Sequence, residues 1–297
     1  MRLLITVVIG LLIALVVPAC STGTEPESPG DEAGSDTEAD TISLVADFDP
    51  SSLWVPTAGP GTVDVRVGIF LHSRQGPGER TWLDREAEQV AGAIMRASTD
   101  LAQCDLRLRP EVFQVISLPL RLWAVRGTDG ETWGGHPPEG TEDPALFNYR
   151  ENNRLTDETR ELFGYGKRFT SPNAISIFVV EKISYATKAG GGFVGGLSFS
   201  PNLYHHPDDY PLRNSILVAL DAGPTGLPTP GSWTTHTVAH ELGHMLLNTG
   251  LHSSLPYNLM SEYVGYWDEL TPEQCERMRH VREWLFGDEE IADPGPP

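Results

Sequence analysis

The segment that most constrains the fold reads HTVAHELGHMLLNTGLHSSLPYNLMSE and runs from His236 to Glu262. Within it, His240, Glu241 and His244 form the pattern HELGH. Histidines four residues apart project from one face of an α-helix, about one turn from each other, so both imidazoles can reach one point. Small and apolar residues lie between and around them, as in a helix packed inside a protein. The pattern therefore predicts a buried helix that presents two imidazoles and a carboxylate to one site.

Neutral imidazoles at this spacing are typical zinc ligands, and a catalytic zinc site uses three protein ligands and keeps one position for water. We expect His240 and His244 to hold Zn²⁺. Glu241 is expected to accept a proton from that water and to pass it later to a leaving amine. His236 precedes His240 by one turn, but the helix axis carries it too far from a tetrahedral centre. It is expected to be a neighbour of the site or a hydrogen-bonded core histidine.

From this motif onward the sequence resembles the metzincin clan of zinc peptidases. The motif of that clan continues from HExxH to a glycine that ends the helix and to a third histidine, and a methionine-containing turn follows beneath the metal. The matching residues here are Gly250, His252 and Met260 in YNLMS. The resemblance implies that His252 joins His240 and His244 as the third metal ligand.

The spacing departs from the clan pattern. Seven residues separate the second and third histidines here, whereas the clan has five, and Leu247 stands where the clan has glycine. Asn248 tolerates the left-handed conformation that ends a helix, and Gly250 adds a second flexible position, so the chain can still reverse toward the metal. The alternative third ligand is Glu262, because a downstream glutamate plays that part in the thermolysin-like arrangement.

The rest of the folded region alternates strand and helix patterns. Apolar or alternating stretches at 62–73, 104–118, 173–183 and 214–223 predict strands, and 81–103 predicts a long amphipathic helix. Five glycines between 190 and 196 accompany a rim strand, and a short helix at 156–163 lies in an insertion over 127–172. Thr271 and Pro272 are typical of the start of a C-terminal helix.

These patterns predict an α+β fold. The order of elements from 62 to 285 resembles the zincin and metzincin architecture. The resemblance implies a twisted mixed sheet with a long backing helix, an active-site helix and a small C-terminal helical lobe.

The N-terminus is typical of an exported protein. An arginine and a short apolar run end in VVPAC, which resembles the lipobox of bacterial lipoproteins, so residues 1–19 are expected to be a signal peptide and Cys20 a lipidated anchor. Residues 20–45 are expected to be a disordered tether, since 21–40 carry seven acidic residues and no basic one. Residues 46–297 then form the metallopeptidase domain, with an upper lobe to about 250 and a lower lobe at 251–290.

The net charge limits the possible binding partners, and the cysteine content predicts a bond within the chain. A formal net charge of −20 argues against nucleic-acid binding. In an oxidising compartment, Cys104 and Cys275 are expected to form a disulfide, the alternative being two buried thiols.

The expected function is that of a cell-envelope lipoprotein, anchored to the membrane through Cys20, that hydrolyses protein or peptide substrates as a zinc endopeptidase. The peptide would lie extended along the glycine-bearing rim strand near Gly190 to Ser200. Two alternatives stay open. One is an inactive domain of the same fold that binds a surface partner. The other is a zinc amidase that acts on cell-wall material.

Overall fold

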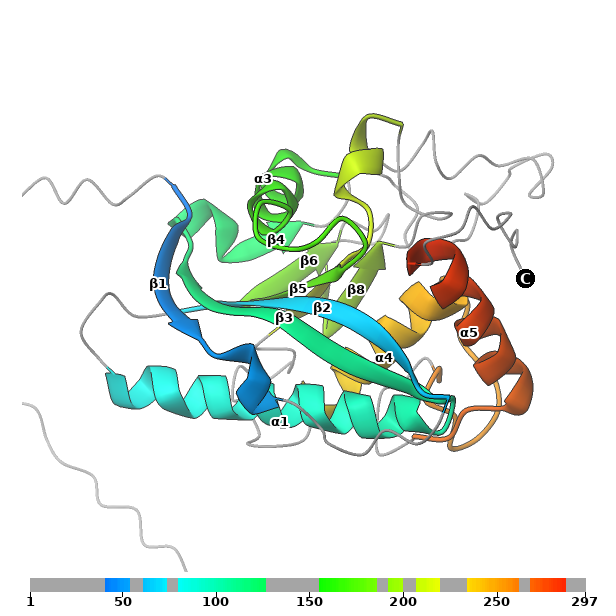
Figure 1. Cartoon of the computed structure of the whole chain (residues 1–297). Helices are drawn as coiled ribbons and strands as arrows, with labels where there is room; N and C mark the ends of the chain where they lie inside the picture. Colours follow the sequence, from blue (N-terminus) through cyan, green and yellow to red (C-terminus); the bar gives the residue numbers. More distant parts are fainter. Residues whose placement is uncertain are drawn as a thin grey trace, which may run out of the picture. The chain divides into compact units, whose positions relative to one another are not determined.

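Six strands form one mixed sheet, in the order β1-β3-β2-β5-β9-β8. The computed structural model describes residues 41–53, 61–73, 80–126, 155–185, 192–199, 207–219, 234–261 and 268–286, all within one unit of the chain, 38–297. The strands of this sheet are β1 (Ser43–Phe48), β2 (Val63–His72), β3 (Leu106–Ser117), β5 (Ile175–Val180), β8 (Gly196–Phe199) and β9 (Ser215–Ala219). The curved sheet crosses the middle of Figure 1.

The central strands are buried on both faces. β2 pairs in parallel with β3 and β5, and β5 pairs in parallel with β9. Successive side chains point to opposite faces, so Ile69 joins one hydrophobic cluster while Phe70 joins the other. All six residues of β5 are buried. This burial explains the nearly continuous apolar sequence of β5, which is typical of a parallel strand covered on both sides.

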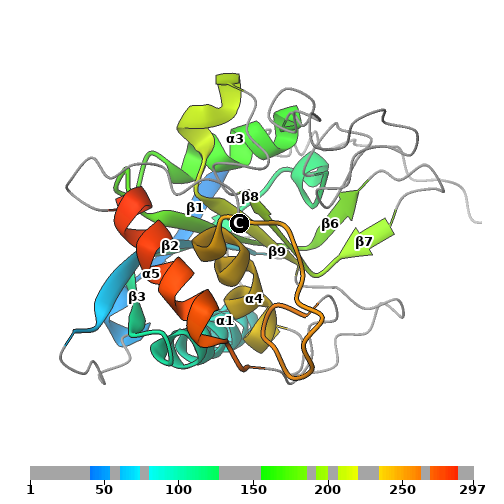
Figure 2. The same cartoon turned by 90° about the vertical axis from the view of Figure 1, so that its right-hand side faces the viewer.

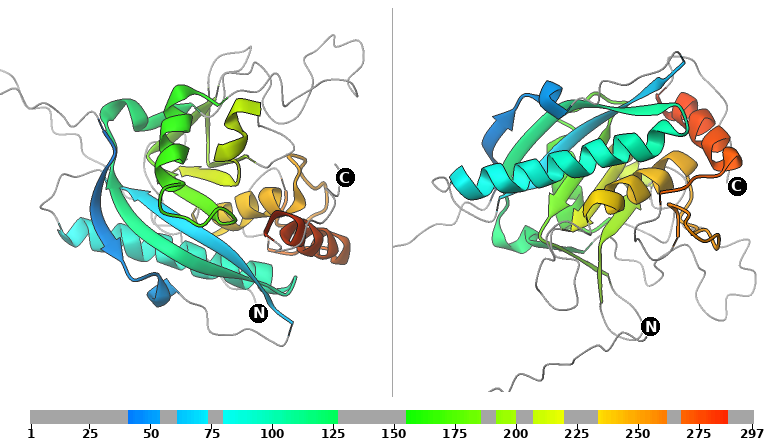
Figure 3. Two further views of the ribbon diagram at one scale, coloured as in Figure 1. Left: turned by 45° about the horizontal axis from the view of Figure 1, so that its top comes forward. Right: turned by 90° about the horizontal axis from the view of Figure 1, so that it is seen from below.

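Helices cover both faces of the sheet. The helices are α1 (Arg80–Ala102), α3 (Asp157–Gly166), α4 (Thr234–Leu247) and α5 (Pro272–Phe286), and the 3-10 turns are η1 (Pro50–Leu53), η2 (Leu120–Leu122) and η4 (Pro207–Leu212). α1 and α4 pack side by side on one face, as Figure 3 shows from below, and α3 lies on the other. α5 packs against the outer side of α4 (Figure 2). The sheet with its backing helix and motif helix confirms the mixed α and β architecture.

Some predicted strands are divided between two sheets. The stretch at 173–183 gives β5 and then β6 (Lys182–Tyr185), and the glycine-rich stretch gives β7 (Gly192–Val194) and β8. β6 and β7 join β4 (Ala124–Arg126) in a separate three-stranded sheet. Alternation alone does not show where a strand changes its partner.

β1 was not among the predicted strands. It starts at Ser43, inside the range predicted as tether, and pairs antiparallel with β3 at the edge of the sheet. Val45, Ala46 and Phe48 pack, partly buried, against one hydrophobic cluster, but this apolar run is short and directly follows the acidic segment.

Part of the chain lies outside the described residues. The predicted signal peptide, Cys20 and most of the predicted tether are in this part. Among the helices that the structure does describe, none has the length and apolar character needed to cross a bilayer.

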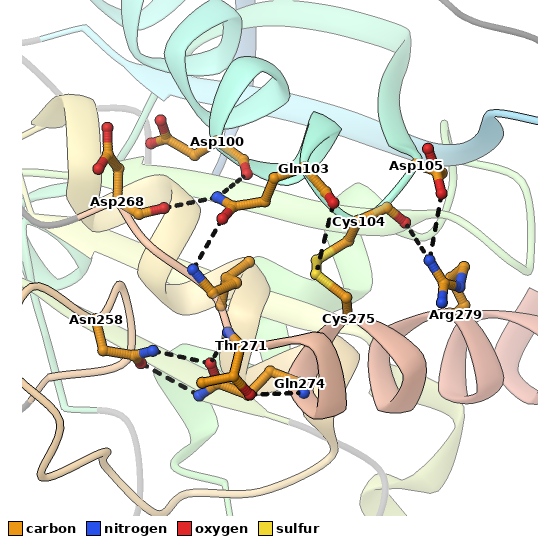
Figure 4. The surroundings of a disulfide bond; sticks show 11 residues. Asp100, Gln103, Cys104, Asp105, Asn258, Asp268, Thr271, Gln274, Cys275 and Arg279 are labelled. Carbon is orange, nitrogen blue, oxygen red and sulfur yellow. Dashed lines mark hydrogen bonds and ion pairs between the residues drawn. A yellow bond between two sulfur atoms is a disulfide. The ribbon is translucent and has the colours of Figure 1, made fainter.

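The predicted disulfide between Cys104 and Cys275 is present and joins the end of α1 to the first turn of α5 (Figure 4). Both cysteines are buried. Hydrogen bonds surround the bridge, because Gln103 accepts from the Leu270 N–H at 2.8 Å and Arg279 donates to the Cys104 carbonyl at 3.4 Å. α5 is thereby attached both covalently and by polar contacts to the helix that backs the sheet.

Removing this disulfide is expected to destabilise the protein strongly. The bridge spans 171 residues of sequence, and closing so long a loop restricts the unfolded chain. The double variant Cys104→Ser, Cys275→Ser should lose about 2–5 kcal/mol of unfolding free energy, measured by denaturant titration. A midpoint equal to that of the oxidised wild type would contradict a structural role for the bridge.

Candidate metal centre

Helix α4 presents the HELGH motif and ends where the chain must reverse. The residue after its last turn, Asn248, has a φ of 54°, in the left-handed region. The Thr249 N–H donates to the His244 carbonyl at 3.2 Å, which closes the end of the helix. Within the described residues the left-handed conformation after α4 falls on Asn248 and not on Gly250. Of the two positions at which the sequence would allow the chain to reverse, Asn248 and Gly250, the chain uses Asn248.

The reversal brings the three predicted ligands together. The Nε2 atoms of His240 and His244 lie 3.0 Å apart, and those of His244 and His252 lie 3.3 Å apart. Ligand atoms of all three residues lie within 4.8 Å of one another. Two additional residues between the second and third histidines therefore do not prevent convergence. Glu262, the alternative third ligand, lies outside the described residues.

Backbone carbonyls determine which nitrogen of two of these rings carries hydrogen. His240 Nδ1 lies 2.7 Å from the Leu259 carbonyl oxygen, and His244 Nδ1 lies 2.9 Å from that of Thr249. A carbonyl only accepts, so each Nδ1 must donate its hydrogen. In a neutral ring the Nε2 atom then keeps a free lone pair. These lone pairs point at one another, an arrangement that a bound cation would stabilise.

Burial keeps the two helix imidazoles neutral. Burial lowers the pKa of His240 to about 4, and His252 lowers it too, while the hydrogen bond to Leu259 acts in the opposite direction. The pKa of His244 lies well below its usual value because of burial and of its two histidine neighbours. His252, in contrast, is exposed. Neutral imidazole nitrogens such as those of His240 and His244 are donors that a divalent transition metal prefers.

Met260 of the predicted methionine turn lies against the motif helix α4. A Cβ added to Gly243 would meet the Met260 sulfur at 2.3 Å. The glycine of HELGH is therefore the residue that lets this loop come close to α4. Met260 and the neighbouring Leu259 are both buried, and Leu259 supplies the carbonyl that orients His240.

Glu241 is buried beside the edge strand β8. Its carboxylate accepts a hydrogen bond from the Ser198 hydroxyl at 2.5 Å, and the same hydroxyl lies 2.7 Å from the Glu241 carbonyl oxygen. A Cβ on Gly196 would meet the carboxyl group at 2.4 Å, so only glycine fits here without displacing it. Burial raises the pKa of Glu241 to about 7, while the Ser198 hydrogen bond acts in the opposite direction.

Ser198 is one of the residues at this site that the sequence did not reveal. It lies on the predicted rim strand, but nothing in its sequence marks it as a partner of the motif glutamate. The contact depends on how β8 passes α4, which is a feature of the tertiary structure.

His236 belongs to the core and not to the histidine cluster. Its Nδ1 lies 3.4 Å from the Asp100 carboxylate of α1, a distance longer than a well-formed hydrogen bond. Arg96 donates to the other oxygen of Asp100 at 2.9 Å and to Asp268 at 2.7 Å. Burial raises the pKa of Asp100, and Arg96 and His236 oppose that effect. His236 is thus a buried core histidine, as one of the two expectations had it, but its Nδ1 does not make the expected hydrogen bond.

Two glycine-to-alanine variants test the close contact beneath α4. Gly92 and Gly243 both lie inside helices, but a Cβ at Gly92 meets nothing within 4 Å. Gly92→Ala should stabilise the protein by about 0.5–1 kcal/mol, since alanine restricts the unfolded chain more than glycine does. Gly243→Ala should destabilise it by about 1–3 kcal/mol, because Met260 must move. Thermal unfolding measures the stability of both variants. Equal changes in stability would mean that Met260 does not lie against the helix.

The stability of the metal-free protein should depend on the charge of Glu241. The pKa of Glu241 in the folded protein, about 7, exceeds the 4.5 of an unperturbed glutamate. The carboxyl group therefore contributes stability below about pH 4.5, and this contribution is lost as the pH rises through 7. In the presence of a chelator, Glu241→Gln should be more stable than wild type at pH 8, and the difference should shrink toward pH 5.

The exposed Glu273 provides the control for this experiment. Hydrogen bonds with its own backbone N–H and with Thr271 lower the pKa of Glu273, so its charge is favoured in the folded state. Glu273→Gln should not increase the stability of the protein at pH 8. A gain as large as that of Glu241→Gln would mean that net charge, and not burial, explains the effect.

Comparison with known proteins gives similarity in structure alone. No protein-family model matches the sequence, and no curated protein matches it either. Among solved structures, the chain is similar to metalloproteinase-II from Bacteroides fragilis, with 11% identity and a TM-score of 0.35 over 82% of this chain and 58% of that one. It is also similar to a mutant of promirolysin from Tannerella forsythia, with 12% identity and a TM-score of 0.37 over 80% and 85%. The chain thus spans less than two thirds of the Bacteroides protein, and the functional argument depends on the geometry of the site.

Proposed function

We propose that this protein is an exported, membrane-anchored zinc endopeptidase. The observation that carries the proposal is the convergence of three histidine Nε2 atoms beside a buried glutamate. His240, His244 and His252 would hold the metal, and three imidazole nitrogens fit the ligand set of a catalytic zinc site.

Zinc, when bound, supplies a Lewis acid that polarises a carbonyl group and lowers the pKa of water. The chain itself supplies the group that moves protons. Glu241 takes a proton from the attacking water and passes it to the leaving amine, which needs a carboxyl group that exchanges its proton near neutral pH. The raised pKa of Glu241, about 7 in the metal-free protein, suits that task. The hydrogen bond from the Ser198 hydroxyl keeps the Glu241 carboxylate next to β8.

The edge strand β8 offers a binding surface for an extended peptide. In the six-stranded sheet β8 is the last strand and pairs with β9 on one side. An edge strand can add a further strand through main-chain hydrogen bonds. Since the same strand contacts Glu241, a peptide added there would pass close to the reacting group. This placement favours a peptide bond as the substrate.

Export and anchoring follow from the N-terminal sequence. The apolar run that ends at Cys20 supports cleavage after residue 19 and lipidation of that cysteine. The Cys104–Cys275 bridge agrees with folding in an oxidising compartment of the cell envelope. The acidic residues between Cys20 and β1 would act as a spacer between the membrane and the domain.

Substitution of Glu241 tests this proposal directly. The purified full chain with zinc should cleave casein or a peptide mixture, and phenanthroline should abolish the cleavage. Glu241→Ala should lose roughly 10²–10⁴-fold in kcat, because the proton acceptor is gone while the metal donors remain. Metal analysis should find zinc in this variant at the wild-type level.

His252→Ala serves as the companion variant and should lose bound zinc together with activity. Zinc bound by the wild type without any cleavage would instead favour a surface binding module. Cleavage of cell-wall material but not of peptides, identified by mass spectrometry of the products, would favour the amidase.

A further inference from the structure

The orientation of His240 depends on one peptide unit in the loop beneath the metal centre. The Leu259 carbonyl accepts the hydrogen of His240 Nδ1 at 2.7 Å. The N–H of the same peptide unit belongs to Met260, and it donates to the Asn258 side-chain oxygen at 3.0 Å. A trans peptide unit is planar, with its C=O and N–H pointing in opposite directions. Whatever holds the N–H therefore also sets the direction of the carbonyl that orients His240.

No regular secondary structure supports this peptide unit. It lies between α4 and α5, and Tyr257 just before it has a φ of 63°, in the left-handed region. The Leu259 N–H donates to the Glu269 carbonyl at 2.8 Å, and the Met260 carbonyl accepts from Ser253 at 2.7 Å. These bonds hold the flanking peptide units. The unit between them receives its second hydrogen bond from Asn258.

The Asn258 amide is in turn held by Gln274 of α5 (Figure 4). Asn258 Nδ2 donates to Gln274 Oε1 at 2.9 Å, and Gln274 Nε2 donates to Asn258 Oδ1 at 3.2 Å. Asn258 is 2% exposed, so water does not compete for these bonds. Two amides that exchange both hydrogen bonds fix each other in one orientation.

Gln274 is itself anchored at the start of α5. Its side chain accepts from the Thr271 N–H at 2.8 Å, while its own N–H donates to the Thr271 hydroxyl at 3.2 Å, which forms a capping box. The next residue, Cys275, is joined to Cys104. A continuous series of contacts thus leads from the disulfide through Gln274 and Asn258 to the His240 ring.

We infer that Asn258 and Gln274 are positioning residues of the metal site, which act through the Leu259–Met260 peptide unit on His240. This inference rests on the proposed function, since it assigns residues that orient a ligand of the proposed zinc. Neither residue touches the imidazole nitrogens that face the metal. Their effect should appear as weaker and less regular metal coordination, and not as the loss of a ligand.

Zinc affinity of the purified full chain, measured by competition with a chelating dye, tests the inference. Asn258→Ala removes the acceptor for the Met260 N–H, and the dissociation constant for Zn²⁺ should rise roughly ten-fold, as for other residues that orient metal ligands. In the Co²⁺-loaded protein, the visible absorption of tetrahedral cobalt should weaken in parallel. Asn258→Asp keeps an oxygen acceptor at this position and should recover most of the affinity.

Thr271→Ala is the matched control. It removes the hydroxyl that caps α5, at a typical cost of about 1 kcal/mol in stability, but leaves the Asn258–Gln274 pair in place. Its zinc affinity should equal that of the wild type. If Asn258→Ala also binds zinc as tightly as the wild type, the inference is wrong.

A second variant covers the case in which Asn258→Ala does not fold. Gln274→Met keeps the length and helix propensity of the side chain but cannot exchange hydrogen bonds with Asn258. Weaker zinc binding than in Thr271→Ala would support the inference, and equal binding would overturn it. A folded wild type that binds no zinc would contradict the proposed function itself, which distinguishes that failure from this one.

Discussion

The site depends on the convergence of histidine lone pairs at one point. Hydrogen bonds to the Leu259 and Thr249 carbonyls leave the facing nitrogens of His240 and His244 without hydrogen. Burial then keeps both rings neutral, so the electrostatic cost of facing lone pairs is not relieved by protonation. A divalent cation removes that cost and gains the donors at once. The three histidines therefore form a cluster that could bind a metal ion.

The clustered histidines are held partly by regular secondary structure and partly by a loop. α4 is packed between the sheet and α5, which fixes two of the histidines. The third histidine, the Leu259 carbonyl and Met260 come from the loop at 248–261, where neither helix nor sheet imposes an order. Hydrogen bonds to the start of α5, and the disulfide that attaches α5 to α1, take over that role. Such support from neighbouring elements offsets the lower precision with which a loop otherwise holds a functional group.

Glu241 shows how stability and reactivity oppose each other at the centre. It is buried against Gly196 and Ser198, and burial raises the pKa of its carboxyl group to about 7. A carboxylate in this place destabilises the folded chain at neutral pH, yet a group that exchanges its proton near that pH is what the proposed peptide hydrolysis would need. The single hydroxyl of Ser198 compensates for only part of the burial.

The sequence alone determined two of the three clustered histidines and most of the elements around them. Hydrophobic periodicity was enough to predict the long backing helix and the buried central strands. Their apolar patterns are long, and each element is packed in the same way along its length. HELGH sufficed for two of the clustered histidines, since helical spacing is a local property. The disulfide partners were predicted as well, because Cys104 and Cys275 are the two cysteines left in the predicted domain once the lipobox cysteine is assigned.

Tertiary structure decided everything that depends on segments meeting across the chain. Sequence left His252 and Glu262 as alternatives for the third position, and the turn at Asn248 brought His252 to the cluster. The Ser198 contact, the division of strands between two sheets and the Asn258–Gln274 pair carry no local signature. Each is a relation between residues distant in sequence, and the packing of one element on another determines which of them meet.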